Sequence, residues 1–340
     1  MKKINFAIIG FGGIAKTHAL AANIANLKFN LPYSLNLTHI VTRRPINLNL
    51  LGVENVQNVE EVLKNPDISF VDICTPNSSH FKILNKVVEY NKPVYCEKPL
   101  SSKYENSLEM TRLVSEKNLI NSVALIYRFM PAIRMIKNEI ENKTIGDIID
   151  FKIKLYHKSY LNPNKSKTWR TRKEAGGGAL LDLGVHLLDI INFTLGNIEK
   201  ADIHKSIFFK ERTEVDEIAD VRLSLENGIN GSLEVSRIFA EREDLTTYII
   251  YGTNGSIKMS SASPYTIEIY NYTTNCTQIK SATLGSDILK YYPNERDSLG
   301  FFQDCHTASL IDFTNKVYDK NTDSIGAEFI DSINSEKWIK

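Results

Sequence analysis

Short apolar runs alternate with longer segments of helical spacing through the first 125 residues. The apolar runs predict strands at residues 4–9, 37–42, 69–74, 94–96 and 120–126. The segments between them repeat apolar residues three and four apart, which predicts helices at 14–24, 59–64, 79–90 and 104–117. Continuous apolar strands joined by helices are typical of a parallel sheet with helices on both faces. Residues 1–125 are therefore predicted to form a doubly wound α/β domain.

After residue 125 the pattern changes to half-buried strands. Within 150–157, apolar Phe151, Ile153 and Leu155 alternate with polar residues, which predicts a strand with one wet face. Similar segments predict strands at 201–209, 218–225, 231–239, 248–251, 256–259 and 266–270, and helices are predicted at 133–141, 178–195 and 300–318. Residues 126–340 are predicted to form an α+β domain with a large, mostly antiparallel open sheet, one face of which could carry a subunit interface. A C-terminal helix could pack back on the first domain.

Composition narrows the class of protein. A chain of 340 residues suggests about two domains. Hydrophobic residues make up 42% and the net charge is +1, so nothing indicates binding to nucleic acid or to an anionic membrane. The apolar start is broken by Gly10, Gly12 and Gly13, so it reads as a strand and turn rather than a signal peptide. Four scattered cysteines form no disulfide framework, which favours a reducing cytoplasm.

A glycine motif follows the first predicted strand. Gly10, Gly12 and Ala15, with Gly13 and Ile14 between them, fit the pattern GxGxxA at the start of a helix. The first glycine allows a tight turn, the second lets the backbone approach a pyrophosphate, and the small alanine permits close packing. This context predicts a Rossmann dinucleotide-binding domain, although an ordinary strand-to-helix turn remains an alternative.

The end of the second predicted strand bears on the choice of cofactor. An acidic residue there usually accepts hydrogen bonds from the ribose 2′-hydroxyl of NAD. This chain instead has Thr42, Arg43 and Arg44, and guanidinium groups and a hydroxyl match a 2′-phosphate. The sequence therefore favours NADP over NAD. Two solvated surface arginines are the alternative.

A polar loop closes another predicted strand. Thr75, Pro76 and Asn77 lie at the carboxyl end of the sheet, where ligands bind in such folds. His80 follows in the first turn of the next helix, so it could reach a cofactor or make a local polar contact. We count all four residues as candidates for the cofactor site.

These motifs are similar to those of a known family. The chain resembles the Gfo/Idh/MocA oxidoreductases, named for glucose–fructose oxidoreductase and inositol dehydrogenase. The matching pieces occur in the family's order along essentially the whole chain: residues 10–18, 75–80, Glu97-Lys98-Pro99, Trp169-Arg170, and the Gly-Gly-Gly…Asp…His segment at 176–186. The glycine-rich segment and Glu-Lys-Pro together are quite specific.

The resemblance implies a role for Lys98. In the family this lysine contacts the substrate hydroxyl and the nicotinamide ribose, and its bond to the following proline is often cis. An ammonium group beside the reacting oxygen stabilises developing alkoxide charge. Glu97 would hold the loop or pair with a cation. Without the other motifs, a solvated loop lysine would be the preferred interpretation of Lys98.

Asp182 and His186 lie four residues apart on one predicted helix, so their side chains share a face. In relatives of the inositol dehydrogenase type this pair is retained, which implies that His186 is the general base. Asp182 would orient the histidine or bind a substrate hydroxyl. The alternative is a structural pair at the edge of an apolar helix.

Two further pairs are candidates for contacts near the reaction centre. In relatives, the arginine equivalent to Arg170, which follows Trp169, often approaches the cofactor or the substrate. Tyr127 and Arg128, just after the last strand of the first domain, are placed to contact substrate. A structural role is as plausible for each. The remaining histidines show no metal-ligand spacing, so no metal is predicted.

The predicted activity is hydride transfer between a nicotinamide cofactor and a secondary hydroxyl or ketone. The resemblance implies a sugar, sugar derivative or cyclitol as substrate, and a homodimer or homotetramer. It also implies that residues 126–340 form the domain for substrate binding and oligomerisation. Two alternatives remain open. One is an NAD-dependent glycosidase of the same fold, and the other is a dinucleotide-binding sensor without catalysis. The sequence leaves the substrate and the physiological direction unassigned.

Overall fold

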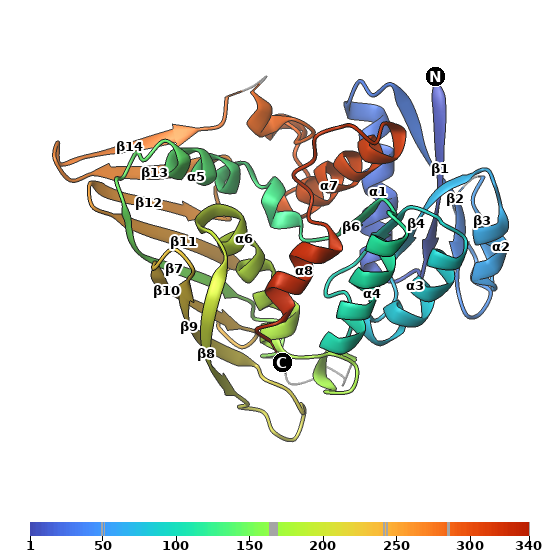
Figure 1. Cartoon of the computed structure of the whole chain (residues 1–340), viewed down its shortest axis with the longest axis horizontal. Coiled ribbons are helices and arrows are strands. Elements are labelled where there is room, and N and C mark those ends of the chain that lie inside the picture. The colour runs from blue at the N-terminus through green and yellow to red at the C-terminus, as the bar shows by residue number, and fades with distance from the viewer. Residues whose placement is uncertain are drawn as a thin grey trace. The chain divides into compact units, whose positions relative to one another are not determined.

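The computed structural model describes residues 1–48, 50, 52–162, 169–240, 242, 244–283 and 286–339. The chain forms two compact units (Figure 1). The first contains Met1–Ile126 and Tyr291–Ile333, and the second contains Tyr127–Lys290 and Asn334–Lys340. The sequence assigned 126–340 to the second domain but allowed a C-terminal helix to pack on the first; helix α7 (Phe301–Tyr318) lies within the first unit.

The first unit is built on a six-stranded parallel sheet in the order β3-β2-β1-β4-β5-β6. This is the strand order of a dinucleotide-binding Rossmann domain, so the predicted fold is confirmed. Its strands are β1 (Lys2–Ile9), β2 (Tyr33–Val41), β3 (Glu54–Val56), β4 (Ile68–Ile73), β5 (Val94–Cys96) and β6 (Asn121–Val123).

Helices cover this sheet on both faces. They are α1 (Gly13–Lys28), α2 (Val59–Lys64), α3 (His80–Glu89), α4 (Tyr104–Glu116) and α7. Helix α1 packs beside α7, whereas α2, α3 and α4 pack in succession (Figure 1). Right-handed crossovers place α1 on the opposite face from α2, α3 and α4. The reason is that the connection from β1 to β2 runs toward one edge of the sheet, whereas the connections from β3 to β6 run toward the other edge. The stacked rings of Phe6 and Phe70, 4.9 Å apart, lie in the core.

The second unit is built on an eight-stranded sheet in the order β14-β13-β12-β11-β7-β10-β9-β8. Strands β7 and β10 pair in parallel and all other neighbours pair antiparallel, as predicted. The strands are β7 (Ile148–Tyr156), β8 (Ile198–Ser206), β9 (Ile218–Leu225), β10 (Asn230–Ser236), β11 (Leu245–Gly252), β12 (Gly255–Ser260), β13 (Thr266–Asn271) and β14 (Cys276–Ser281).

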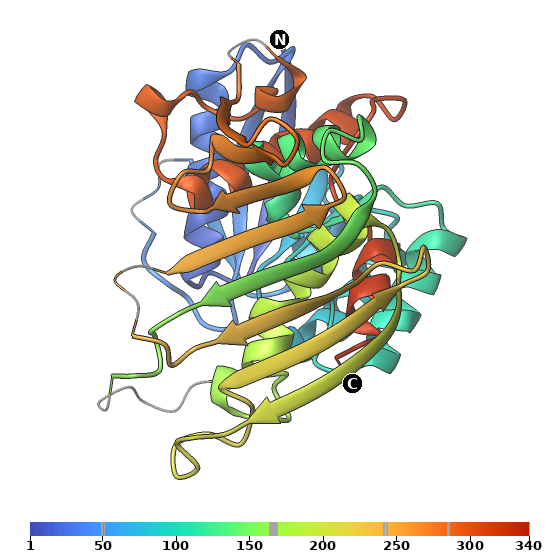
Figure 2. The same ribbon diagram turned by 90° about the vertical axis from the view of Figure 1, so that its left-hand side faces the viewer.

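One face of this sheet is apolar and the other is wet. Phe151, Ile153 and Leu155 of β7 are buried, and helices α5 (Pro131–Glu141) and α6 (Val185–Leu195) lie on that side. Figure 2 looks onto the opposite face, where the strands lie in front of the helices. The last helix, α8 (Phe329–Glu336), spans the boundary between the two units, which falls after Ile333. Among the described residues, no helix combines the length and apolarity needed to cross a membrane.

Candidate active site

Gly10 makes the turn that leaves β1. Its φ is +92°, a backbone conformation that side chains other than glycine rarely adopt. A Cβ atom at this position would lie 2.8 Å from Cγ2 of Thr75 and 2.9 Å from the carbonyl oxygen of Cys74. The turn therefore requires glycine, because the neighbouring loop approaches the backbone so closely.

Gly12 and Gly13 face open space at the start of α1. A Cβ atom on either residue would meet nothing within 4 Å. Gly12 caps the helix without a side-chain hydrogen bond, and the first turn contains no acidic residue. Ala15, one position after Ile14, is fully buried. The open space and the uncompensated positive end of the helix dipole fit the pyrophosphate of a dinucleotide.

Thr42, Arg43 and Arg44 follow β2. The Thr42 hydroxyl donates to the Arg44 carbonyl at 2.7 Å and accepts from the Asn55 amide at 2.9 Å. This hydroxyl therefore shapes the loop, whereas the sequence analysis assigned it to a phosphate. Both arginines are exposed, and among the described residues neither has an ion-pair partner. Their guanidinium groups are available to an anion.

His80 ties two loops together at the carboxyl edge of the sheet. The ring is fully buried, with its nitrogens 2.8 Å from the Thr75 carbonyl oxygen and 3.1 Å from the Leu100 carbonyl oxygen. Burial lowers the pKa of His80, which favours the neutral ring. Asn77, which follows Pro76, is also buried and begins a 3₁₀ turn. The contacts of His80 support the loop, in agreement with the local role considered from the sequence.

Lys98 follows β5, and its peptide bond to Pro99 is cis. Its backbone N–H donates to Oε2 of Glu97 at 3.1 Å. Oε1 of the same carboxylate lies 3.2 Å from Nε2 of His18. Glu97 is buried, whereas Lys98 is partly exposed. Glu97 thus links the backbone of Lys98 to a buried histidine.

In the second unit, Tyr127 covers the imidazole of His186. The two rings stack with centroids 4.9 Å apart and planes inclined by 16°. Tyr127 lies in a 3₁₀ turn, η2 (Ile126–Phe129), and both side chains are buried. The predicted strand at 120–126 is therefore shorter than expected, because β6 ends at Val123 before this turn. Stacking fixes the plane of the His186 ring.

Arg128 makes a buried ion pair one turn of α6 beyond His186. Its Nε donates to Oδ2 of Asp189 at 2.9 Å and its Nη2 donates to Oδ1 at 2.6 Å. Both residues are buried. This two-pronged contact is the geometry that guanidinium and carboxylate groups favour. Arg128 therefore fastens the η2 turn to α6 through Asp189, a partner that was not predicted from the sequence.

Asp182 is held by two arginines. Oδ2 of Asp182 accepts from Nη2 of Arg237, and Nε of Arg170 lies 3.3 Å from the same oxygen. Asp182 and Arg237 are buried, whereas the Arg170 side chain is 45% exposed. Burial lowers the pKa of Arg237 to about 10. Trp169 shares a 3₁₀ turn with Arg170, but its side chain lies outside the described residues.

Arg237 was not predicted from the sequence. It sits at the end of an alternating segment in which its neighbours are Val235, Ser236 and Ile238. An arginine in a segment with this alternation is the available signal, because a buried arginine needs a partner of opposite charge. Its partner lies 55 positions earlier in the chain, so sequence spacing could not identify the pair.

The glycine run fixes the start of the helix that carries Asp182. A Cβ atom on Gly177 would lie 2.2 Å from the carbonyl oxygen of Arg170, so this backbone contact requires glycine. Asp216 then accepts from the backbone N–H of Leu180 at 2.7 Å. The helix predicted at 178–195 begins as a π-helical turn, η4 (Leu180–Gly184), and continues as α6. Such turns are frequent at functional sites.

A cluster of buried ionisable side chains that was not predicted from the sequence lies in the first unit. Two overlapping groups each bring their possible metal-ligand atoms within 4.8 Å of one another: His18, Asp72 and Cys74, and His18, Glu97 and His306. His18 and His306 are 288 positions apart, so no spacing motif could reveal them. The expectation of no metal rested on spacing alone.

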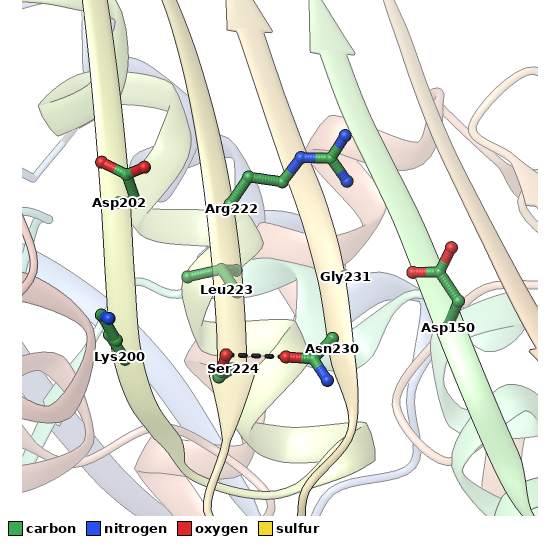
Figure 3. Close-up of a pocket in the computed structure, with 8 residues that line it drawn as sticks. All are labelled: Asp150, Lys200, Asp202, Arg222, Leu223, Ser224, Asn230 and Gly231. Carbon is green, nitrogen blue, oxygen red and sulfur yellow. Dashed lines mark hydrogen bonds between the residues drawn. The ribbon is translucent and has the colours of Figure 1, made fainter.

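A surface pocket lies on the wet face of the eight-stranded sheet, apart from these motifs (Figure 3). Its lining residues come from β7, β8, β9 and β10: Asp150, Lys200, Asp202, Arg222, Leu223, Ser224, Asn230 and Gly231. The Ser224 hydroxyl donates to the Asn230 side-chain oxygen at 2.7 Å. Side chains of both charges stand side by side here, which suits a polar contact surface.

The two units match the two parts of one protein family. Residues 4–125 match the oxidoreductase family with an NAD-binding Rossmann fold, and residues 133–258 match the GFO/IDH/MocA C-terminal domain. The chain is 30% identical to levoglucosan dehydrogenase of Pseudarthrobacter phenanthrenivorans over 286 residues, which cover 76% of this chain and 73% of that protein. The chain belongs to the Gfo/Idh/MocA oxidoreductases.

Other members of the Gfo/Idh/MocA family agree with this assignment. Over 213 residues the chain is 31% identical to scyllo-inositol 2-dehydrogenase (NAD(+)) of Bacillus subtilis, covering 61% of this chain and 60% of that enzyme. A solved structure of levoglucosan dehydrogenase, in complex with NADH and L-sorbose, superimposes with a TM-score of 0.90 at 25% identity. That superposition covers 98% of this chain and 94% of the other. The resemblance inferred from the motifs is confirmed.

Proposed function

We propose that this protein is an NAD(P)-dependent dehydrogenase acting on a secondary hydroxyl or ketone of a sugar, sugar derivative or cyclitol. The observation that carries the proposal is Lys98 at the carboxyl end of β5, in a unit whose glycine turn suits a dinucleotide. The named relatives support the substrate class, since they are dehydrogenases of levoglucosan and of scyllo-inositol.

The glycine turn would hold the dinucleotide. Gly10, Gly12 and Gly13 allow its pyrophosphate to approach the start of α1, while Ile14 and Ala15 continue the first helical turn. The bound nicotinamide supplies the hydride acceptor or donor. Further candidates for contacts with the cofactor are, within the first unit, Thr75, Pro76, Asn77, Glu97 and Lys98. The family resemblance adds Trp169 and Arg170.

The reaction needs one proton and one hydride to leave the substrate carbinol. Lys98 would donate a hydrogen bond to the reacting oxygen and stabilise its negative charge as the proton departs. His186 would take that proton on its imidazole and later release it to solvent. Asp182, as the carboxylate held by Arg170 and Arg237, would position a substrate hydroxyl. The products are a ketone, the reduced cofactor and one proton.

The arginines after β2 favour NADP as the cofactor. Arg43 and Arg44 are exposed, and the hydrogen bond from Thr42 to the Arg44 carbonyl gives their loop its shape. Guanidinium groups bind phosphate oxygens well. The levoglucosan dehydrogenase structure contains NADH, so preference for the cofactor is a property to measure in this chain separately.

A homodimer or homotetramer is part of the proposal. Charged side chains lie on the wet face of the eight-stranded sheet, including Lys154 and Glu234, which are paired at 3.0 Å. A polar sheet face of this kind can pair with a second copy through a two-fold axis. Light scattering after size-exclusion chromatography would show twice or four times the mass of the chain, and a monomer would contradict this expectation.

The direct experiment is a substrate screen. Polyols, inositols, aldoses and anhydrosugars are each incubated with NAD⁺ and with NADP⁺, and the absorbance of reduced nicotinamide is followed. Turnover with at least one compound supports the dehydrogenase. Glycoside cleavage without net reduction would indicate the glycosidase instead. Tight dinucleotide binding without turnover of any kind would indicate a sensor.

A further inference from the structure

The buried histidine behind the Glu97–Lys98 loop joins four parts of the first unit. Nδ1 of His18, on α1, lies 2.8 Å from Oδ2 of Asp72 on β4. Nε2 of His18 lies 3.2 Å from Oε1 of Glu97, after β5, and 3.1 Å from Nδ1 of His306 on α7. His18 and Asp72 are fully buried, and Glu97 and His306 are nearly so.

The carboxylates around His18 favour the protonated form of its ring. Two buried carboxylates flank His18, one at each nitrogen, so a protonated ring with two N–H donors matches both. A neutral ring would turn a lone pair toward one of the carboxylates. Nε2 makes its hydrogen bond with Nδ1 of His306 at 3.1 Å, whereas Oε1 of Glu97, 3.2 Å from Nε2, has no hydrogen bond among the described residues and is held by the charge of the ring. This attraction limits rotation of the Glu97 carboxylate.

The contact continues from Glu97 to the backbone of Lys98. The second carboxylate oxygen of Glu97 accepts the Lys98 backbone N–H at 3.1 Å, so one carboxylate bridges the histidine and the loop. The ring of Tyr95 meets the His18 ring edge-on at 5.5 Å, and the Tyr95 hydroxyl lies 2.7 Å from Oγ of Ser309 on α7. The histidine is therefore held on several sides.

From these contacts we infer that His18 is a positioning residue for Lys98, acting through Nε2 and the Glu97 carboxylate, with His306 fixing the ring. The effect on turnover rests on the proposed dehydrogenase function. The effect on the loop does not. The separation of 3.1 Å between His18 and His306 is an ordinary hydrogen-bond length, and 3.2 Å between His18 and Glu97 is close enough for an ion pair.

Two amide substitutions separate the nitrogens of His18. In His18→Asn the short side chain can reach only the position of Nδ1, so the contact with Asp72 is kept and that with Glu97 is lost. In His18→Gln the amide reaches the position of Nε2, so a donor toward Glu97 is kept. Both variants lose the ring, which makes each the stability control of the other. Thr314→Val, which removes a buried hydrogen bond within α7, controls for general loosening of this unit.

Hydrogen exchange read by mass spectrometry tests the loop without any need for activity. We expect the peptide containing the Lys98 amide to exchange about tenfold faster in His18→Asn, and at the wild-type rate in His18→Gln and Thr314→Val. With a substrate from the screen, kcat should fall about tenfold in His18→Asn only, with the KM for dinucleotide within twofold of wild type. Equal exchange and equal kcat in the two His18 variants would overturn the inference.

The inference and the proposed function fail in different ways. If no compound in the screen is turned over, the dehydrogenase proposal fails, while the exchange experiment still reports on His18. A metal analysis of the purified wild-type protein adds a second check. One equivalent of a bound transition metal, lost in His306→Phe, would replace the hydrogen-bonded network with a metal site and overturn the inference.

Discussion

The ring of Tyr127 stacks on the imidazole of His186 at 4.9 Å between centroids, with only 16° between the planes. The next residue, Arg128, makes two hydrogen bonds to Asp189, which lies three positions after His186 on α6. The short η2 turn is thus attached to the helix at two successive residues. The orientation of the proposed general base is therefore set within the second unit, before any ligand binds.

Removal of the aromatic ring of Tyr127 should impair turnover. An aromatic pair contributes about 0.5–1.5 kcal/mol beyond its burial, so Tyr127→Leu is expected to lower kcat roughly fivefold as His186 gains rotational freedom. Tyr127→Phe keeps the stack and should retain most of the activity. Steady-state kinetics on one substrate compares the three proteins. Equal losses in both variants would show that the hydroxyl matters rather than the stack.

Loss of the Arg237 guanidinium should be costly to stability. Arg237 and Asp182 form a buried ion pair, and breaking such a pair costs about 3–5 kcal/mol because a charge is left in a poor environment. Urea denaturation of Arg237→Met should show a loss in this range. Lys143→Ala removes an exposed pair with Asp147 and should change stability by less than about 0.5 kcal/mol. Similar small losses in both variants would contradict the buried-pair account.

Replacing Arg43 and Arg44 should reduce the preference for NADP⁺. Replacement of both by alanine removes two cations placed to meet a 2′-phosphate, so kcat/KM with NADP⁺ should fall at least tenfold. The value with NAD⁺ should change little. Arg112→Ala is a suitable control, since this exposed arginine pairs with Glu109 and Glu116 on α4. A wild-type protein that already prefers NAD⁺ strongly would overturn our reading of these arginines.

Stability should fall as pH rises above neutrality because of His18. Burial alone would lower the pKa of His18, but the facing charges of Asp72 and Cys74, and hydrogen bonds to both, raise it well above 6.5. The folded protein then keeps a proton that the unfolded chain releases. This contribution is complete below about pH 6.5 and is lost as pH rises through the pKa of the folded state.

Urea denaturation between pH 6 and 9 measures this contribution. The other groups that face His18 are Tyr95, Glu97 and His306, from β5, the loop after it and α7. The wild type should lose up to about 1.4 kcal/mol per pH unit above the pKa of the unfolded histidine. His18→Gln should show a smaller slope over the same range. Parallel slopes would mean that His18 does not carry the shifted proton.

The sequence predicted most of the fold because burial dictates pattern. Strands buried on both faces read as apolar runs, and β7 shows the alternation of a strand with one wet face. Strand β3 was missed because it has only three residues, Glu54–Val56, and none of them is buried. Strand β14 was missed because all six of its residues are exposed at the sheet edge, which leaves no alternation.

The site residues could be predicted where they form local patterns in the sequence. The glycine turn, Glu97-Lys98-Pro99 and the Asp182–His186 pair are local patterns. The residues that hold these patterns in place are far apart in the sequence. Arg237 reaches Asp182 from 55 positions away, and His306 reaches His18 from 288 positions away. Only the folded chain brings such pairs together, so their roles follow from contacts rather than from spacing.

The most direct test of the central claim compares wild type with Lys98→Met and His186→Ala on a substrate found in the screen. Initial rates of reduced-nicotinamide formation should fall by about 100-fold or more in each variant, because each removes charge stabilisation or proton transfer from the transition state. Dinucleotide binding, followed by fluorescence, should survive in His186→Ala. Full turnover by both variants would contradict the account.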